Sequence, residues 1–443
     1  MPIPTFVINL LSRTDRKAHI ITEFAGRDEY DMSIVEACIH EHGSIGLWET
    51  MLKIVRHAVD NDLEYVLICE DDHQFTEAYS YEGLSVAIEQ ARAMKADVLC
   101  GGISWMQTGV AVTEELFWVE KFTGTQFMFV FKQFYHSMLS VIFTVMDSAD
   151  YKISSMTNRK FVVYPFMSIQ KEFGYSDATP QNIQIGRVDE LFESTSQNFY
   201  TLNDVARYFS GLRSQVALPI APYELATATV STFVINLPER EERRAHIIEQ
   251  FAGRPEFDVT IIDAIKHEVG ALGLWLSIRK IVETALANDD DVIIIAEDDH
   301  EFTPAYSRYT FMRNIIETAQ LGIEYLSGGC SHFEHAVPVT SGLYWVSFFQ
   351  ATQFIVLYRP AFQKILDAPF DDSVVADLQL SHMFANKMIV YPAISTQKNF
   401  GYSDVTSSHN QNKNLVFSMF QHTKMRLERI NEMMTEQEAF CLP

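Results

Sequence analysis

The chain has 443 residues, of which 47% are hydrophobic and 21% charged, and its formal net charge is −24. This composition is typical of a folded globular protein with two or three domains and excludes a disordered chain. The negative charge argues against broad electrostatic capture of nucleic acid or of an anionic membrane, although it is compatible with a local basic groove.

No apolar stretch is long enough to span a bilayer, and the N-terminus MPIPTFVINL lacks the basic start and the cleavage site of a secretory signal. The five cysteines form no CxxC pair, which favours free thiols in a reducing compartment. We therefore expect a cytoplasmic protein without a transmembrane segment. The sequence contains no signal for its oligomeric state.

Strands and helices alternate along the first part of the chain. Short apolar strands are predicted at TFVINL (5–10), DMSIVEA (31–37), EYVLIC (64–69) and DVLC (97–100), and the segments between them have helical spacing of apolar residues. This alternation predicts the α/β class, with helices on both faces of a mostly parallel sheet. Ligands of such sheets bind beyond the carboxyl ends of the strands.

The same order of segments then occurs a second time. Four segments recur at a constant offset of 227 residues, namely TFVINL (5–10, 232–237), HIITEFAGR or HIIEQFAGR (19–27, 246–254), EDDH (70–73, 297–300) and FGYSD (173–177, 400–404). We predict two tandem three-layer α/β/α domains at 1–182 and 229–412. The segment 183–228 is predicted to be a linker with one helical stretch, and 413–443 a helical C-terminal tail.

An acidic triplet ends the third strand of each repeat. Glu70, Asp71 and Asp72 follow YVLIC, and Glu297, Asp298 and Asp299 follow VIIIA. Adjacent carboxylates repel one another, so a fold that keeps them together needs compensation, and a divalent cation is the usual one. A solvated acidic turn is the alternative interpretation.

Cationic residues follow the first strand of each repeat. VINLLSRTDR places Asn9, Arg13 and Arg16 after that strand, and the second repeat has Asn236, Arg240 and Arg243. Two arginines at this spacing can project toward one anion near a helix start, whereas an exposed cationic turn is the alternative. Together with the acidic triplet, the arginines favour a site for a metal ion and a phosphate-bearing ligand.

These segments together resemble the family 25 glycosyltransferases, the lipooligosaccharide and collagen galactosyltransferase group. The family pattern is a VINL-x-x-R-x-(D/E)-R strand and loop, an apolar strand ending in EDD, and a YP…Q…SD segment. The last segment is YPFMSIQKEFGYSD at 164–177 and YPAISTQKNFGYSD at 391–404. The chain departs from the family at GLWETMLK and GLWLSIRK, which lack the family's Cys and Ser-His pair.

The resemblance implies a GT-A fold, a nucleotide-sugar donor, Mn²⁺ or Mg²⁺, and glycosyl transfer with inversion. Asp72 and Asp299 match the metal-binding acid. The resemblance further implies that the other acidic residues of each triplet, Glu70, Asp71, Glu297 and Asp298, contact ribose or metal-bound water. Asn9, Arg13 and Arg16 with their partners Asn236, Arg240 and Arg243 would line the nucleotide pocket.

Inversion also needs a carboxylate that accepts the proton of the acceptor hydroxyl. Asp150 and Asp377 correspond at the offset of 227 and are the first candidates, with a helix N-cap as the alternative role. Asp177 and Asp404, in the GYSD segments, are the second candidates, with a turn-forming role as the alternative.

The residues and the resemblance together predict a glycosyltransferase with two potential active sites, and the resemblance implies a nucleotide-sugar donor such as a UDP-sugar. The alternatives are one catalytic domain with one degenerate binding or scaffolding domain, or a non-catalytic protein that binds nucleotide sugars or glycans. A glycan, a lipid-linked glycan, a protein or a modified nucleobase are the acceptor classes. The repeats differ at SWMQTG (104–109) and SHFEHA (331–336), where acceptor contacts are expected.

Overall fold

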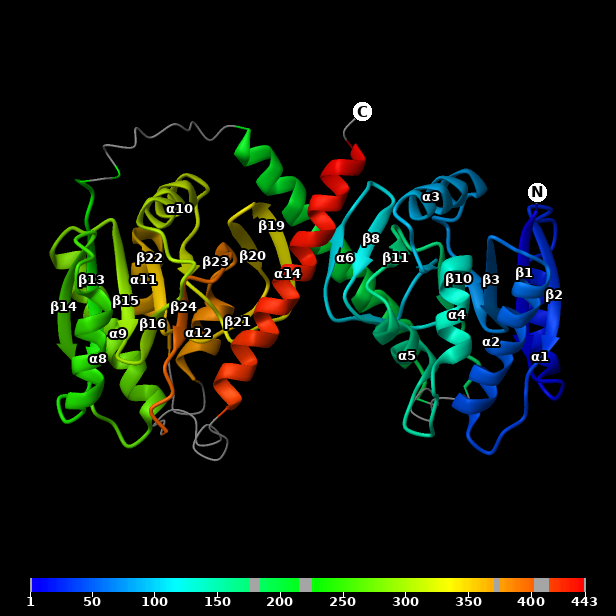
Figure 1. Ribbon diagram of the computed structural model, residues 1–443, viewed down its shortest axis with the longest axis horizontal. Helices are drawn as coiled ribbons and strands as arrows, with labels where there is room; N and C mark the ends of the chain where they lie inside the picture. The colour runs from blue at the N-terminus through cyan, green and yellow to red at the C-terminus, as the bar shows by residue number, and fades with distance from the viewer. Residues whose placement is uncertain are drawn as a thin grey trace. The chain divides into compact units, whose positions relative to one another are not determined.

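The computed structural model describes residues 2–174, 184–214, 225, 227–369, 375–401 and 414–441, the last of these with side chains up to 435. The chain divides into two compact units, Met1–Asp204 with Met433–Pro443 and Val205–Glu432. Figure 1 shows a sheet and its surrounding helices in each unit. None of the described helices is long and apolar enough to cross a membrane.

The elements of the two repeats follow the same order. Those of the first are β1 (Ile3–Asn9), α1 (Thr14–Glu23), β2 (Tyr30–Glu36), α2 (Gly43–Asp60), β3 (Tyr65–Glu70), β4 (His73–Phe75), α3 (Tyr81–Ala93), β5 (Val98–Cys100), β6 (Trp105–Met106), β7 (Gly109–Ala111), β8 (Leu116–Val119), β9 (Phe122–Thr123), β10 (Phe127–Phe131), α4 (Lys132–Ser140), α5 (Ala149–Met156), β11 (Lys160–Val163), β12 (Ser168–Gln170) and α6 (Arg187–Arg213).

The second repeat has a matching element for each of these. They are β13 (Val230–Asn236), α8 (Glu241–Phe251), β14 (Phe257–Asp263), α9 (Gly270–Ala287), β15 (Val292–Glu297), β16 (His300–Phe302), α10 (Arg308–Gln320), β17 (Tyr325–Ser327), β18 (His332–Phe333), β19 (Ala336–Thr340), β20 (Leu343–Val346), β21 (Phe349–Gln350), β22 (Phe354–Tyr358), α11 (Arg359–Asp367), α12 (Ala376–Met383), β23 (Lys387–Val390), β24 (Ser395–Gln397) and α14 (Leu415–Cys441).

Each repeat is built on one eight-stranded sheet. The strand order is β2-β1-β3-β10-β5-β11-β8-β7 in the first and β14-β13-β15-β22-β17-β23-β20-β19 in the second. In the first sheet β10 and β8 run against the other strands, and in the second β22 and β20 do so. The sheets are therefore mostly parallel, as predicted.

Helices cover both faces of the first sheet. Phe6 pairs in register with Ile68, and Phe127 pairs with the adjacent Cys69, so the two phenyl rings point to opposite faces. On one face the ring of Phe6 lies 5.2 Å from His57 of α2. On the other, the Phe127 ring lies 4.7 Å from His73, against which the end of α1 also packs. The predicted α/β class with two three-layer domains is confirmed.

The central strands β3 and β15 set the position of the acidic triplets. Their cores, VLIC at 66–69 and IIIA at 293–296, are between 0 and 1% exposed. Strands in the middle of a sheet that is covered on both faces are continuously apolar in this way. The first polar residues, Glu70 and Glu297, consequently lie at the carboxyl edge of the sheet.

A long helix follows the last strand of each repeat. The helical stretch predicted within 183–228 and the helical tail predicted at 413–443 correspond to α6 and α14, which each have 27 residues and make equivalent contacts. Thr195 Oγ1 donates a hydrogen bond to the carbonyl of Ser104 at 2.8 Å, and Thr423 Oγ1 donates one to Ser331 at 2.9 Å. The first half of each helix therefore belongs to the repeat that precedes it.

Candidate functional site

The first and third strands of each repeat bring their polar ends together. β1 and β3 are parallel neighbours with Ile8 opposite Glu70, so Asn9 and Asp71 emerge side by side. Asn9 Nδ2 donates a hydrogen bond to Asp71 Oδ2 at 2.7 Å, and the equivalent bond from Asn236 to Asp298 measures 2.8 Å. The polar residues after the first strand and the acidic triplet after the third strand therefore lie together in both repeats.

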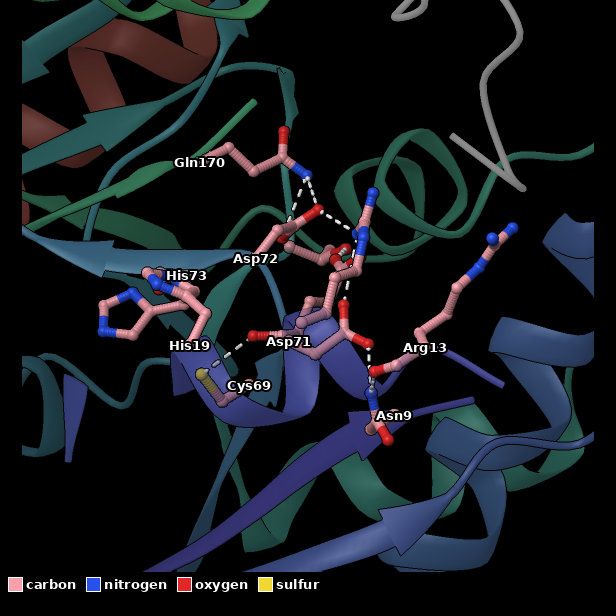
Figure 2. A network of polar contacts seen from close by, with 11 residues as sticks. Asn9, Arg13, His19, Cys69, Asp71, Asp72, His73 and Gln170 are labelled. Atoms are coloured by element: carbon pink, nitrogen blue, oxygen red, sulfur yellow. Dashed lines mark hydrogen bonds and ion pairs between the residues drawn. The ribbon is translucent and has the colours of Figure 1, made fainter. Parts of the chain in front are cut away.

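One arginine in each repeat holds two carboxylates. Arg16, in the first turn of α1, places Nη1 3.1 Å from Asp71 Oδ1 and 2.8 Å from Asp72 Oδ2. Arg243 is 2.9 Å from Asp298 and 3.3 Å from Asp299. A buried guanidinium is therefore one cation that compensates the acidic triplet. Figure 2 shows that Arg13, by contrast, extends away from Asp71 and Asp72.

Asp72 and Asp299 differ in the partners of their carboxylates. Gln170 Nε2 lies 3.4 Å from Oδ1 and 3.3 Å from Oδ2 of Asp72. Gln397 lies beside Asp299 and lowers the pKa of its carboxyl group, but Oδ1 of Asp299 is buried and has no partner within hydrogen-bond distance. Burial raises the pKa of each aspartate to about 6, against the lowering effect of the neighbouring arginine.

The glutamates that open the triplets are held apart from the arginines. Thr125 Oγ1 donates to Glu70 Oε1 at 2.7 Å, and Thr352 does the same for Glu297 at 2.7 Å. Burial, and then the charge of the nearby aspartate, raise the pKa of both glutamates to about 8. The raised pKa favours the neutral form of each glutamate, which lowers the repulsion within the triplet.

The histidines after the triplets pack in the core. His73 and His300 have no exposed surface, and Nδ1 of each lies 2.8 Å from the hydroxyl of Ser168 or Ser395. Burial lowers the pKa of His300 to about 3 and that of His73 well below its ordinary value. These neutral rings support the strand ends.

Asp150 and Asp377 lie at the second position of α5 and α12, so the N-cap interpretation of these residues is wrong. Each carboxylate accepts two backbone hydrogen bonds. Asp377 accepts from the N–H of Ala351 at 3.1 Å and of Leu378 at 2.9 Å, and Asp150 has the equivalent bonds. Burial raises the pKa of Asp377. Asp177 and Asp404 lie outside the described residues.

A cavity of about 990 Å³ in the second unit is lined by most of the second-unit residues described above. Its walls come from the loops after β13, β15 and β24 and from the start of α12. Among its lining residues are Arg240, Arg243, Asp298, Asp299, Asp377 and Lys398. The cavity thus has cationic side chains next to carboxylates.

One histidine in each repeat, His19 and His246, was not predicted as part of this site. His246 Nε2 lies 3.0 Å from the carbonyl oxygen of His300, and Nδ1 lies 3.3 Å from Lys398 Nζ. Because an ammonium group only donates, Nδ1 accepts and Nε2 carries the hydrogen. His19 and Lys171 repeat this arrangement. The signal was present, because His19 and His246 open the recurring HII segment.

No cluster of three or more His, Cys, Asp or Glu side chains suited to a metal ion occurs in the part of the chain that the structure describes. Each acidic triplet offers aspartates that are tied to arginine and a glutamate that is tied to threonine. A metal ion at Asp72 or Asp299 would therefore depend on ligands from a bound substrate.

No protein-family model and no curated protein sequence matches the chain. Solved structures that are similar to part of it include the following three. A197 from STIV has 12% identity and a TM-score of 0.28, over 40% of this chain and 87% of A197. A glycosyltransferase involved in the glycosylation of the major capsid of PBCV-1 has 12% identity and a TM-score of 0.25, over 36% and 81%. Apo UDP-glucose pyrophosphorylase has 11% identity and a TM-score of 0.25, over 45% and 81%.

Proposed function

We propose that the chain is a metal-dependent glycosyltransferase that moves a sugar from a UDP-sugar to an acceptor hydroxyl with inversion, and that each repeat is a diverged relative of the family 25 glycosyltransferases. The observation that carries this proposal is the cavity of the second unit, in which Arg240 and Lys398 share the walls with Asp299 and Asp377. A sugar diphosphate needs cations for its phosphates and a carboxylate near its reacting carbon.

The basic residues of the cavity bind and orient the diphosphate. Arg240 offers a planar set of donors to phosphate oxygens, and Lys398 adds an ammonium group that His246 holds in place. Arg243 is committed to Asp298 and Asp299, so it fixes the carboxylates. Asn236 adds a second donor to Asp298.

Asp299, and Asp72 in the first unit, would hold Mn²⁺ or Mg²⁺. The buried, unpartnered Oδ1 of Asp299 fits this role, because carboxylate oxygens are the ligands these ions prefer. Mg²⁺ is commonly held by one or two carboxylates together with substrate phosphates, which suits a site with a single available carboxylate. When bound, the ion neutralises the charge that develops on the departing nucleoside diphosphate.

Asp377, and Asp150 in the first unit, accept the proton in this mechanism, with Asp404 and Asp177 as second candidates. The acceptor oxygen forms its bond to the anomeric carbon while the bond from that carbon to the phosphate oxygen breaks. The hydroxyl proton moves to the carboxylate. The raised pKa of Asp377 makes it a stronger base than an exposed aspartate.

A specific difference favours the alternative of one catalytic and one binding unit. Asp72 has Arg16 at 2.8 Å and Gln170 near both oxygens, whereas Asp299 has Arg243 at 3.3 Å and Gln397 beside it but no partner within hydrogen-bond distance of Oδ1. On this basis the second unit is the catalytic one, and the first binds donor more weakly.

The test is UDP release from a panel of UDP-sugars in the presence of Mn²⁺. The wild type is compared with Asp72→Ala, Asp299→Ala and the double variant. We expect the double variant to lose at least 100-fold in rate, and Asp299→Ala to account for most of that loss. Activity that is unchanged in the double variant would overturn the proposal.

A further inference from the structure

We propose that the second unit binds its acceptor as a neutral saccharide, in a pocket formed by His332, Phe348 and His422 beside the donor cavity. This inference rests on the proposed function and names the substrate class of the same site. The pocket has a volume of about 440 Å³ and lies between the β18–β21 sheet and α14. That volume is within the range of about 300–1,000 Å³ that small-molecule sites occupy.

The pocket adjoins the cavity that contains the carboxylates. Ser331, Gln350 and Met419 line both spaces. A molecule in the pocket therefore reaches toward the same cavity that Asp299 and Asp377 line. An acceptor needs this placement, because its hydroxyl must meet the donor sugar at a site where a base is available.

The chemistry of the walls favours a neutral polyhydroxylated ligand. None of the described residues that line the pocket is Asp, Glu, Lys or Arg. The rings of His332 and Phe348 lie 6.1 Å apart, and burial lowers the pKa of His332, which keeps its ring neutral. A neutral imidazole offers one donor and one acceptor to hydroxyl groups, and the phenyl ring offers an apolar surface to a sugar's C–H face. The charged side chains that act on His332, Arg426 and Glu334, are not among the residues that line the pocket.

The first unit has a different surface at the equivalent place. Trp105, which is 41% exposed, replaces His332, and Lys121 replaces Phe348. Lys121 Nζ donates a hydrogen bond to Ser155 Oγ at 2.7 Å, and Ser194 stands in place of His422. The two repeats share their triplets and arginines but differ here, so the proposed acceptor pocket belongs to the second unit.

The experiment applies the fluorescently labelled full-length protein to a printed array of neutral and charged oligosaccharides. We expect the wild type to be retained by a set of neutral glycans. Phe348→Lys and His422→Ser, which introduce the residues of the first unit, should each lower that signal at least 10-fold. The matched control Lys121→Phe changes the first unit only and should leave the signal unchanged.

Retention of no glycan by the wild type, selection of charged glycans only, or equal signals from all variants would overturn the inference. Calorimetric titration of UDP with Mn²⁺ is run on the same proteins. UDP binding that is equal in wild type and Phe348→Lys shows that the donor site is intact. A wild type that does not bind UDP contradicts the proposed function, whatever the array shows.

Discussion

Arg243 Nη1 lies 3.3 Å from Asp299 Oδ2, while Oδ1 of the same carboxylate has no hydrogen-bond partner. The guanidinium neutralises part of the acidic triplet without covering both of its oxygens. Burying an unpaired polar atom is costly unless a ligand compensates for it. Arg243 therefore fixes the position of the Asp299 carboxylate through Oδ2 and leaves Oδ1 available to a ligand.

The role of Asp299 as a metal ligand predicts that UDP and Mn²⁺ stabilise the protein together. At a ligand concentration of about 100 times Kd, binding adds about 2.7 kcal/mol to the free energy of unfolding. Asp299→Asn should remove most of the Mn²⁺-dependent increase in Tm, and Asp72→Asn should remove less. Thermal shift with UDP alone, with Mn²⁺ alone and with both measures this. Equal shifts in both variants would contradict the difference between the units.

Asp377 can be a base, a support for the neighbouring turn, or both. Asp377→Asn keeps an acceptor for the N–H of Ala351 but cannot take a proton at neutral pH. We expect kcat to fall about 100-fold or more, because general-base catalysis contributes roughly 10²–10⁴-fold, while UDP affinity stays within about twofold.

Asp377→Ala is the matched comparison, because it removes both functions. If Asp377 only supports the turn, Asp377→Asn will retain nearly full activity and Asp377→Ala will lose stability and UDP affinity together. Single-turnover rates and UDP titrations on both variants separate these outcomes.

The fold could be predicted from the sequence because its signals are local or repeated. Continuous apolar runs such as VLIC and IIIA identify central strands, and the offset of 227 residues between the EDDH segments identifies the duplication. The sequence also predicts that Asn9 and Asp71 lie at one edge of the sheet, because the carboxyl ends of parallel strands lie on the same side. These inferences require only the periodicity of the chain.

The partners of individual side chains could not be predicted in the same way. Nothing in VINLLSRTDR shows that Arg16 turns back onto two aspartates while Arg13 extends away from them (Figure 2). The sequence did not reveal that α6 and α14 are equivalent helices of the two repeats. Their offset is 228 residues rather than 227, and few of their residues are identical. Burial, which decides the protonation of Glu70, depends on contacts between distant segments.

Backbone strain distinguishes the turns that Asp150 and Asp377 support. The first turn has Gly124 at a φ of +105°, but the second has Ala351 at +89°, a region that an alanine rarely adopts. Ala351→Gly should therefore raise the free energy of unfolding by about 1 kcal/mol. Gly124→Ala should lower it by about 1–2 kcal/mol, since the added Cβ would lie 3.1 Å from both Gln126 Oε1 and Ser104 N.

Denaturant unfolding of both variants measures these changes. Ala245→Gly, at an exposed position inside α8, is the control and should destabilise by about 1 kcal/mol, because glycine is unfavourable inside a helix. A destabilising Ala351→Gly of the same size as the control would show that Ala351 carries no strain.

His335 should make stability depend on pH. Burial, with a smaller contribution from Arg426, lowers its pKa from 6.5 to about 4, and its Nδ1 has no hydrogen-bond partner. The unfolded chain therefore binds a proton that the folded chain does not, and stability is lost as pH falls from about 6.5 toward 4. The linkage corresponds to about 2 kcal/mol between pH 7.5 and pH 5.

The first repeat has Thr108 at the position of His335, so His335→Thr is the natural substitution. We expect this variant to lose about 1–2 kcal/mol less than the wild type when denaturant unfolding is repeated at pH 7.5 and pH 5. His382→Ser removes an exposed histidine and should leave the pH dependence unchanged. If His335→Thr and His382→Ser show the same pH dependence as the wild type, then His335 is protonated as readily in the folded protein as in the unfolded chain, and its burial does not oppose its charge.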